Sequence, residues 1–314
     1  MKRVLAITHL EEDEQLEMVR NSLIQQCDVS LVTLCTNYEK SFGLSLVVSG
    51  SECFVYHNDV LFNPDVVWYA THPRTDALYS QNFRFPGEHR SAMTQFIQDL
   101  HYVLQHETKW IPGDFDRLCQ ADSKPFLLSQ AAQFGLLTPE ETLNGTLPNK
   151  SVLTSEKLYR KKLGFPSVIS FDKRGKKEVI TTTRNRLGDR SSGCEIWQWQ
   201  SPVESVAHVR CCVVGNNVWS VAWQRKSPLN RLYDYRSQEL KEEWCDYVLP
   251  PQVEGSLKEL TSRLGIQISC PEFLLKENGD HVFIDMNPCG DWAGFFEESV
   301  NLEISNHIAQ LLLS

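Results

Sequence analysis

Residues 271–292, PEFLLKENGDHVFIDMNPCGDW, carry more structural information than any other stretch of the chain. Two apolar runs flank the sequence ENGD, and Asn-Gly is a strong signal for a tight turn between antiparallel strands. Pairing across such a turn brings Glu272 and Asp285 close together on adjacent strands. Asn287 follows two residues after Asp285, and it shares the same sheet face because side chains alternate along a strand.

Two carboxylates and an amide oxygen on one sheet face predict a magnesium site. Mg²⁺ prefers oxygen ligands, commonly one or two carboxylates together with phosphate oxygens of a substrate. Unpaired carboxylates about 4 Å apart repel each other by a few kcal/mol, and a metal between them reverses this cost. The alternative is a hairpin edge with solvated acids. The apolar neighbours Phe273, Val282 and Phe283 indicate a buried hairpin and therefore favour the metal site.

The first 112 residues predict an α/β domain with a parallel sheet. A strand, a helix and a second strand follow one another at the start, and this order implies a right-handed crossover between parallel strands. No GxGxxG motif is present, which disfavours a dinucleotide site. The expected elements are a strand at 3–8, a helix through Leu16, Val19, Leu23 and Ile24, strands at 28–34 and 65–69, and a helix at 88–106.

The remaining chain predicts a central domain at 113–195 with a helix and hairpins, and a C-terminal domain at 196–314. Pro and Gly in Trp110-Ile-Pro-Gly113 mark the first boundary. The expected elements are a helix at 124–137, a strand at 178–183, a hairpin at 208–224 closed by Gly215-Asn216-Asn217, a helix at 252–264 and a last helix at 302–313.

Composition excludes several classes of protein. The net charge of −9 and the lack of a long basic stripe disfavour nucleic acid as a partner. No apolar run approaches the roughly 20 residues needed to cross a bilayer, and no secretory signal is recognisable, so we expect no membrane partner and a cytoplasmic protein. The ten cysteines contain no CxxC pair, which favours free thiols over disulfides or a zinc site.

Motifs spread over nearly the whole chain resemble a known family. Lys124, the Lys161–Lys162 region and Arg210 precede Glu-x₁₂-Asp-x-Asn in the order found in ATP-grasp ligases. Within this superfamily the chain is most similar to the microviridin-type peptide macrocyclases, or graspetide synthetases. The order of the shared motifs along the chain and the NPxGxW ending make the resemblance specific. The shared motifs are Trp68-Tyr69, Trp110, Ala121-Asp-Ser-Lys124, Gly135-Leu-Leu-Thr-Pro139, His208-Val-Arg210 with Gly215, Asp234-Tyr-Arg236 and Asn287-Pro288-Cys-Gly290-Asp-Trp292.

The resemblance implies an ATP-grasp fold with an N-terminal parallel-sheet domain, the cofactors ATP and Mg²⁺, and a role for each matching residue. Arg210 would hold the transferred phosphoryl group or the acyl-phosphate, since a guanidinium binds such groups through two parallel bonds. Arg236 either shares this role or pairs with Asp234 structurally. The other implied residues are Lys124 and Lys161 or Lys162 at the nucleotide phosphates, Gln200, Val203 and Glu204 around the adenosine, and Glu272, Asp285 and Asn287 at Mg²⁺.

The implied reaction is activation of an Asp or Glu side chain of a ribosomally made precursor peptide as an acyl-phosphate. A Thr, Ser or Lys of the same peptide would then close an ester or amide ring. The implied partners are this peptide with its leader segment and a second copy of the chain in a homodimer. Two alternatives remain open, an intermolecular amino acid or peptide ligase and a nucleotide-binding pseudo-ligase.

Two departures from the family pattern bear on these alternatives. The commonest metal pattern has Asp first and Glu second, whereas Glu272 and Asp285 are reversed. The Trp-Tyr pair of the family is generally followed by Arg-Arg, and Ala70 and Thr71 stand there instead. We therefore expect contacts to the substrate peptide that differ from those of relatives.

Overall fold

The structure, a computed structural model, describes residues 1–8, 13–36, 43–71, 86–140, 142–145, 157–162, 168–171, 177–180, 183–186, 197–224 and 244–314. For residues 86–91 and for the strands between 142 and 199 it describes the backbone alone.

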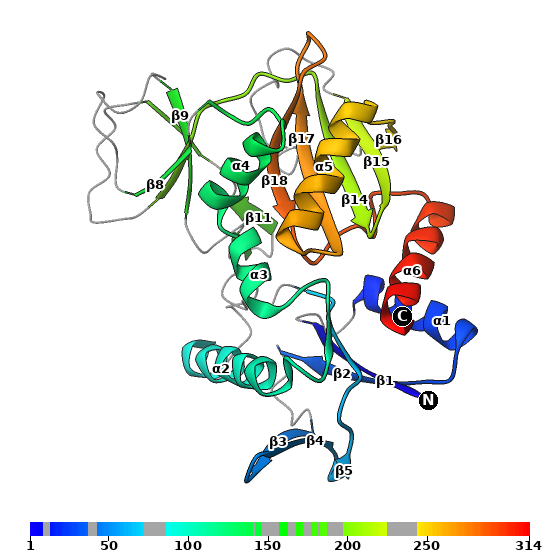
Figure 1. The fold of residues 1–314 in the computed structure, drawn as a ribbon. Coiled ribbons are helices and arrows are strands. Elements are labelled where there is room, and N and C mark those ends of the chain that lie inside the picture. Colours follow the sequence, from blue (N-terminus) through cyan, green and yellow to red (C-terminus); the bar gives the residue numbers. More distant parts are fainter. Residues whose placement is uncertain are drawn as a thin grey trace.

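A four-stranded parallel sheet forms the N-terminal part of the molecule (Figure 1). Its order is β2-β1-β6-β7, with β1 at Lys2–Thr8, β2 at Val29–Cys35, β6 at Val66–Tyr69 and β7 at Lys109–Ile111. Helix α1 (Glu14–Gln26) packs on one face, where Val4 meets Leu16 and Val19, and α2 (Pro86–Leu104) packs on the other, where Leu5 meets Ile97. A parallel sheet must be covered on both faces, and these two helices do so.

A separate three-stranded antiparallel sheet, which the sequence did not predict, follows β2. It consists of β3 (Leu44–Ser49), β4 (Glu52–His57) and β5 (Val60–Leu61), at the bottom of Figure 1. Its valines at 47, 48 and 60 are exposed. These segments are short and only partly buried, so they lack the clear alternation by which a strand is recognised in sequence.

The central part of the chain contains two short helices followed by short strands. Helices α3 (Phe115–Ala121) and α4 (Lys124–Gln133) lead into a sheet of order β12-β9-β13-β8 and a hairpin β10–β11. The strands are β8 at Thr142–Gly145, β9 at Lys157–Lys162, β10 at Val168–Phe171, β11 at Lys177–Ile180, β12 at Thr183–Arg186 and β13 at Trp197–Gln200.

A five-stranded antiparallel sheet of order β16-β15-β14-β17-β18 dominates the C-terminal part. Helix α5 (Pro251–Leu264) covers the sheet face that carries Val209, Cys211 and Phe273, and α6 (Glu298–Leu313) packs with α1 beside the opposite face. The strands are β14 at Ala207–Val214, β15 at Asn217–Gln224, β16 at Cys245–Asp246, β17 at Ile268–Leu275 and β18 at His281–Asn287. Both hairpins predicted from their turns, β14–β15 and β17–β18, are confirmed.

Two predicted helices have different ends in the structure. Helix α4 stops at Gln133 rather than at 137, because Gly135 adopts a left-handed conformation with φ of 81° and Leu136 N–H bonds back to Ala131. Helix α6 begins at Glu298 rather than at 302, since its first turn carries an acid and polar residues instead of an apolar stripe. In the described part of the chain no helix has both the length and the apolar character to span a membrane.

Candidate active site

Three neighbouring strands align the predicted polar residues in one row. Arg210 on β14 is the register partner of Glu272 on β17, and Glu272 is the partner of Asp285 on β18. Register partners on neighbouring strands point to the same face. This face is opposite to the one that α5 covers, so the polar row avoids the main hydrophobic core.

A β-bulge in the β17–β18 pair aims Asp285 into this row. The register shifts between Glu272 and Phe273, so that Glu272 faces Asp285 while Phe273 faces Phe283, and Ile284 is the extra residue. In a regular strand Phe283 and Asp285 would share a face, because they are two residues apart. The bulge separates them, leaving Phe283 in the core and Asp285 in the polar row.

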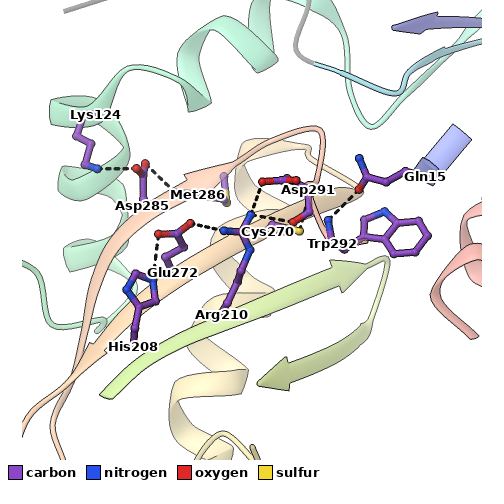
Figure 2. Close-up of polar contacts among 10 residues, drawn as sticks. All are labelled: Gln15, Lys124, His208, Arg210, Cys270, Glu272, Asp285, Met286, Asp291 and Trp292. Atoms are coloured by element: carbon purple, nitrogen blue, oxygen red, sulfur yellow. Dashed lines mark hydrogen bonds and ion pairs between the residues drawn. The ribbon is translucent and has the colours of Figure 1, made fainter. Parts of the chain in front are cut away.

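Arg210 is the buried centre of the row, with a side chain 3% exposed. Its Nη1 donates to Glu272 Oε1 at 2.9 Å, and its Nη2 donates to both the main-chain oxygen and Oδ2 of Asp291 at 2.8 Å (Figure 2). The guanidinium carbon lies 3.9 Å from the centre of the Phe295 ring. A buried cation requires such partners, and these contacts fix the plane of the guanidinium.

Lys124 completes the row from the first turn of α4. Its Nζ lies 2.9 Å from Asp285 Oδ2, and its side chain is 15% exposed, against 38% for Asp285. Asp285 Oδ1 also accepts its neighbour's backbone N–H, from Met286 at 3.1 Å. The carboxylate is thus held from both sides and still reaches solvent.

His208 lies beside the row and contacts Glu272. Its Nε2 is 3.1 Å from Glu272 Oε2, and the His208 ring packs edge-on against Trp244. With Arg210 on Oε1 and His208 on Oε2, both oxygens of Glu272 are positioned. His208 is buried, and its ring points toward Glu272.

The loop after β18 and its contact with α1 add two residues, Asp291 and Gln15, whose roles the sequence did not indicate. Asp291 N–H donates to Cys270 Sγ at 3.3 Å, and Trp292 N–H donates to Gln15 Oε1 at 2.8 Å. Trp292 is 1% exposed and packs in the core shared by α1 and α6. Gln15 and Asp291 come 277 and 81 residues from their partners, so no local pattern identifies them.

The last residue of β13 and the segment that links β13 to β14 carry the residues expected around adenosine. Gln200 is half-buried and its Nε2 has no hydrogen-bond partner among the described residues, and the same holds for Ser205 Oγ. Buried polar atoms normally have a hydrogen-bond partner, so these two atoms without one suit a polar ligand such as a purine. Val203 is half-buried and Glu204 is exposed.

Three expected site residues cannot be judged from side chains. Arg236 lies outside the described residues. Lys161 and Lys162 lie on β9, where their backbones pair with Gln198 and Trp197 of β13, and their side chains are not described. Which of the two lysines faces the site therefore stays a prediction.

The donor set fits Mg²⁺ bound jointly with phosphate. Glu272, Asp285 and Asn287 supply hard oxygens, and Cys289 N–H bonds Asn287 Oδ1 at 3.1 Å and orients it. Within the described ranges no group of three or more His, Cys, Asp or Glu side chains could hold a metal by itself. A site with few protein ligands suits a magnesium ion that also binds phosphate oxygens and water.

Three buried cysteines, Cys211, Cys212 and Cys289, are unsuited to act as nucleophiles. Burial raises the pKa of the Cys211, Cys212 and Cys289 thiols well above their ordinary value. The thiolate is the nucleophilic form, so these side chains are inert. The chemistry of the site therefore depends on its cations, carboxylates and amide.

Comparison with solved structures shows which fold this is. The chain superposes over 99% of its length on 99% of the macrocyclase MdnC from Microcystis aeruginosa MRC, solved with its precursor peptide MdnA, at a TM-score of 0.73 and 16% identity. It covers 97% of the RiPP-associated ATP-grasp ligase from Chryseobacterium gregarium, solved with ADP and leader and core peptides, at a TM-score of 0.75 and 18% identity. The chain has the ATP-grasp fold.

A third solved structure shares the fold, whereas the comparisons with family models and curated sequences find no match. The ATP-grasp ligase PsnB, solved with a precursor variant, Mg and ADP, matches with 15% identity, a TM-score of 0.70, and coverage of 98% of this chain and 97% of PsnB. No protein-family model and no curated protein sequence matches the chain. The predicted ATP-grasp fold with its N-terminal parallel sheet is thus confirmed by the solved structures, at sequence identities of 15 to 18%.

Proposed function

We propose that this chain is an ATP-dependent ligase acting on a ribosomally made precursor peptide. It converts an Asp or Glu side chain of the peptide into an acyl-phosphate, with release of ADP. A Thr, Ser or Lys side chain of the same peptide then attacks the carbonyl carbon and expels phosphate, which closes an ester or amide ring. The observation that carries the proposal is the row of Lys124, Asp285, Glu272 and Arg210 in a fold shared end to end with peptide macrocyclases.

Charge neutralisation is the main task of this site. The two carboxylates, Asp285 and Glu272, lie side by side between the two cations, Lys124 and Arg210. A phosphate group that pairs with the cations would release the carboxylates to bind Mg²⁺, which leaves no charge unpaired. In the proposal Lys124 binds nucleotide phosphate, with Lys161 or Lys162 beside it, and Arg210 holds the transferred phosphoryl group. Arg236 is retained as a second candidate for that group.

The carboxylates and the amide hold the metal in this proposal. Glu272, Asp285 and Asn287 would bind Mg²⁺, which would supply positive charge against the negative charge that develops during phosphoryl transfer. The reversed order of Glu and Asp preserves the number and type of oxygens. The unpaired Gln200 Nε2 and the backbone near Val203 support binding of the adenine, and the exposed Glu204 supports binding of the ribose.

Ring closure is favoured over attack by a second molecule because one bound peptide supplies both reacting groups. Holding them together raises their effective concentration by several orders of magnitude. The solved structures of MdnC, PsnB and the Chryseobacterium ligase contain precursor peptides, which supports a peptide substrate with a leader here. A homodimer and a cytoplasmic location belong to the same proposal, and light scattering of the purified protein tests the dimer.

Intact mass spectrometry tests the reaction. A candidate precursor peptide rich in Thr, Asp and Glu is incubated with the protein, ATP and Mg²⁺. Each ring lowers the peptide mass by about one water, and ADP appears in equal amount. Omission of ATP or Mg²⁺ should abolish the shift.

Other outcomes would identify the alternatives. A gain of one whole amino acid would indicate an intermolecular ligase, which shares every ATP-site residue. The D-cycloserine synthetase DcsG has the same fold at a TM-score of 0.58, and its name does not refer to a peptide. The fold therefore does not restrict the reaction to peptides. Nucleotide binding with no peptide-dependent ADP formation would indicate a pseudo-ligase.

A further inference from the structure

The neighbours of Arg210 differ sharply in their access to solvent. Arg210 and Glu272 have side chains 3% and 19% exposed, whereas the Asp291 side chain is 59% exposed. Asp291 is therefore the partner that holds the buried guanidinium from the solvent boundary.

Asp291 holds this nitrogen with two oxygens of one residue. Nη2 donates to the Asp291 main-chain oxygen and to Oδ2, both at 2.8 Å (Figure 2). Nη1 is held by Glu272 on the other side, and Phe295 lies against the guanidinium face. Rotation about the bonds of the guanidinium would break at least one of these contacts.

The backbone at Asp291 is itself fixed on both sides. Its N–H bonds to Cys270 Sγ, and the next N–H, from Trp292, bonds to Gln15. Gly290 has φ of 87°, and the buried Trp292 anchors the loop in the core. A loop held at three successive residues places the Asp291 side chain reproducibly beside Arg210.

We propose that Asp291 is a positioning residue, which orients the Arg210 fork for the phosphoryl group without contacting the peptide. This inference rests on the proposed function, and the NPxGxW motif leaves position 291 unspecified. A misplacement of about 1 Å at a reacting centre can cost about a hundredfold in rate. The carboxylate therefore affects turnover more than binding.

Steady-state kinetics of peptide-dependent ADP formation provides the first test. Asp291→Ala should lower kcat by about ten- to a hundredfold, with the KM for peptide within about twofold of the wild type. Asp291→Asn retains an acceptor oxygen and should restore kcat to within about threefold. The matched control is Asp65→Ala, which removes another Asp–Arg pair, with Arg3 at 2.8 Å, remote from the row. Unchanged kcat in folded Asp291→Ala would overturn the proposal, as would an Asn variant as impaired as the Ala variant.

Nitrogen-15 NMR of the arginine side chains provides a second test that needs no turnover. Slow rotation of Arg210 should give resolved Nη2 proton signals, assigned by their loss in Arg210→Lys. These signals should average in Asp291→Ala and persist in Asp65→Ala; persistence in both would overturn the inference. If the wild type fails to form ADP with any peptide, the proposed function fails, and the NMR result still decides whether Asp291 orients Arg210.

Discussion

At the scale of single residues, Arg210 is the side chain whose surroundings most restrict replacement. It donates at least three hydrogen bonds, to Glu272 and Asp291, from a position 3% exposed. A lysine there keeps the charge but loses the planar fork and its stacking on Phe295. The residue was implied by the family resemblance, and its contacts agree with the rule that an arginine buried in an apolar hairpin requires an anionic partner.

Arg210→Lys should retain nucleotide binding and lose product. We expect peptide-dependent ADP formation to fall by at least about a hundredfold, because a point charge cannot replace bidentate contacts at the phosphoryl group. Nucleotide affinity is measured by calorimetry and product by mass spectrometry. Arg3→Lys, which alters a half-exposed pair with Asp65, is the control. Normal turnover by Arg210→Lys would reassign Arg210 to a structural ion pair.

Asp285→Asn should leave the fold intact and abolish ADP formation. The substitution removes a charge that would bind Mg²⁺ and that pairs with Lys124, while its 38% exposure limits the cost in stability. Circular dichroism reports the fold and a coupled assay reports ADP. Asp280→Asn, at the exposed turn of the same hairpin, should retain activity. Wild-type ADP release by folded Asp285→Asn would refute the metal assignment.

Sequence identified the residues of the row, since the Asn-Gly turn brings Glu272 and Asp285 onto adjacent strands and the family resemblance implies Lys124 and Arg210. It did not identify Asp291 or Gln15. Their contacts depend on how the loop after β18 meets α1 and β14, which is a property of tertiary packing. The bulge at Ile284 was also missed, although it decides which face Asp285 occupies.

At the scale of elements, local signals explain which parts were predicted. The β14–β15 and β17–β18 hairpins were found because Gly215 and Gly279 mark their turns, with φ of 59° and 90°. Helix α5 was found because its apolar stripe is clear and Gly265 caps its end in a left-handed conformation. The β3–β4–β5 sheet was missed because its short, exposed strands lack such signals.

Gly290→Ala should destabilise the protein more than Gly279→Ala. Both glycines have positive φ, which strains any residue with a Cβ by about 1 kcal/mol. At Gly290 the added Cβ would also lie 3.1 Å from Trp292 Cδ1, whereas at Gly279 it meets nothing within 4 Å. Chemical denaturation of both variants measures the difference, and equal losses would show that the loop yields freely around Trp292.

At the scale of the whole molecule, two buried histidines link stability to pH. Burial lowers the pKa of His101 and of His281 from the ordinary 6.5. The unfolded chain then binds more protons than the folded one near that pH. Stability is therefore full above about 6.5 and is lost as the pH falls from 6.5 toward the lower folded-state pKa values.

His101→Phe should reduce this loss. The ring of His101 packs edge-on against Trp110 at 4.8 Å, and its Nδ1 has no partner among the described residues, so an apolar ring suits the position. Each unit of pKa difference corresponds to about 1.4 kcal/mol. Free energies of unfolding between pH 7.5 and about 5 should depend less on pH in this variant than in the wild type or in the exposed-site control His106→Gln. An unchanged pH dependence would contradict the prediction.

The hydrogen bond from Trp292 N–H to Gln15 joins the two ends of the molecule at the loop that holds Arg210. Gln15 belongs to α1, which is packed on the N-terminal sheet, and Asp291 precedes Trp292 directly. The bond therefore connects helix α1 directly to the residue that follows Asp291 in the chain. A rotation of the N-terminal sheet against β14 and β17 would have to stretch or break this bond, because Gln15 moves with α1 and Trp292 moves with the loop after β18.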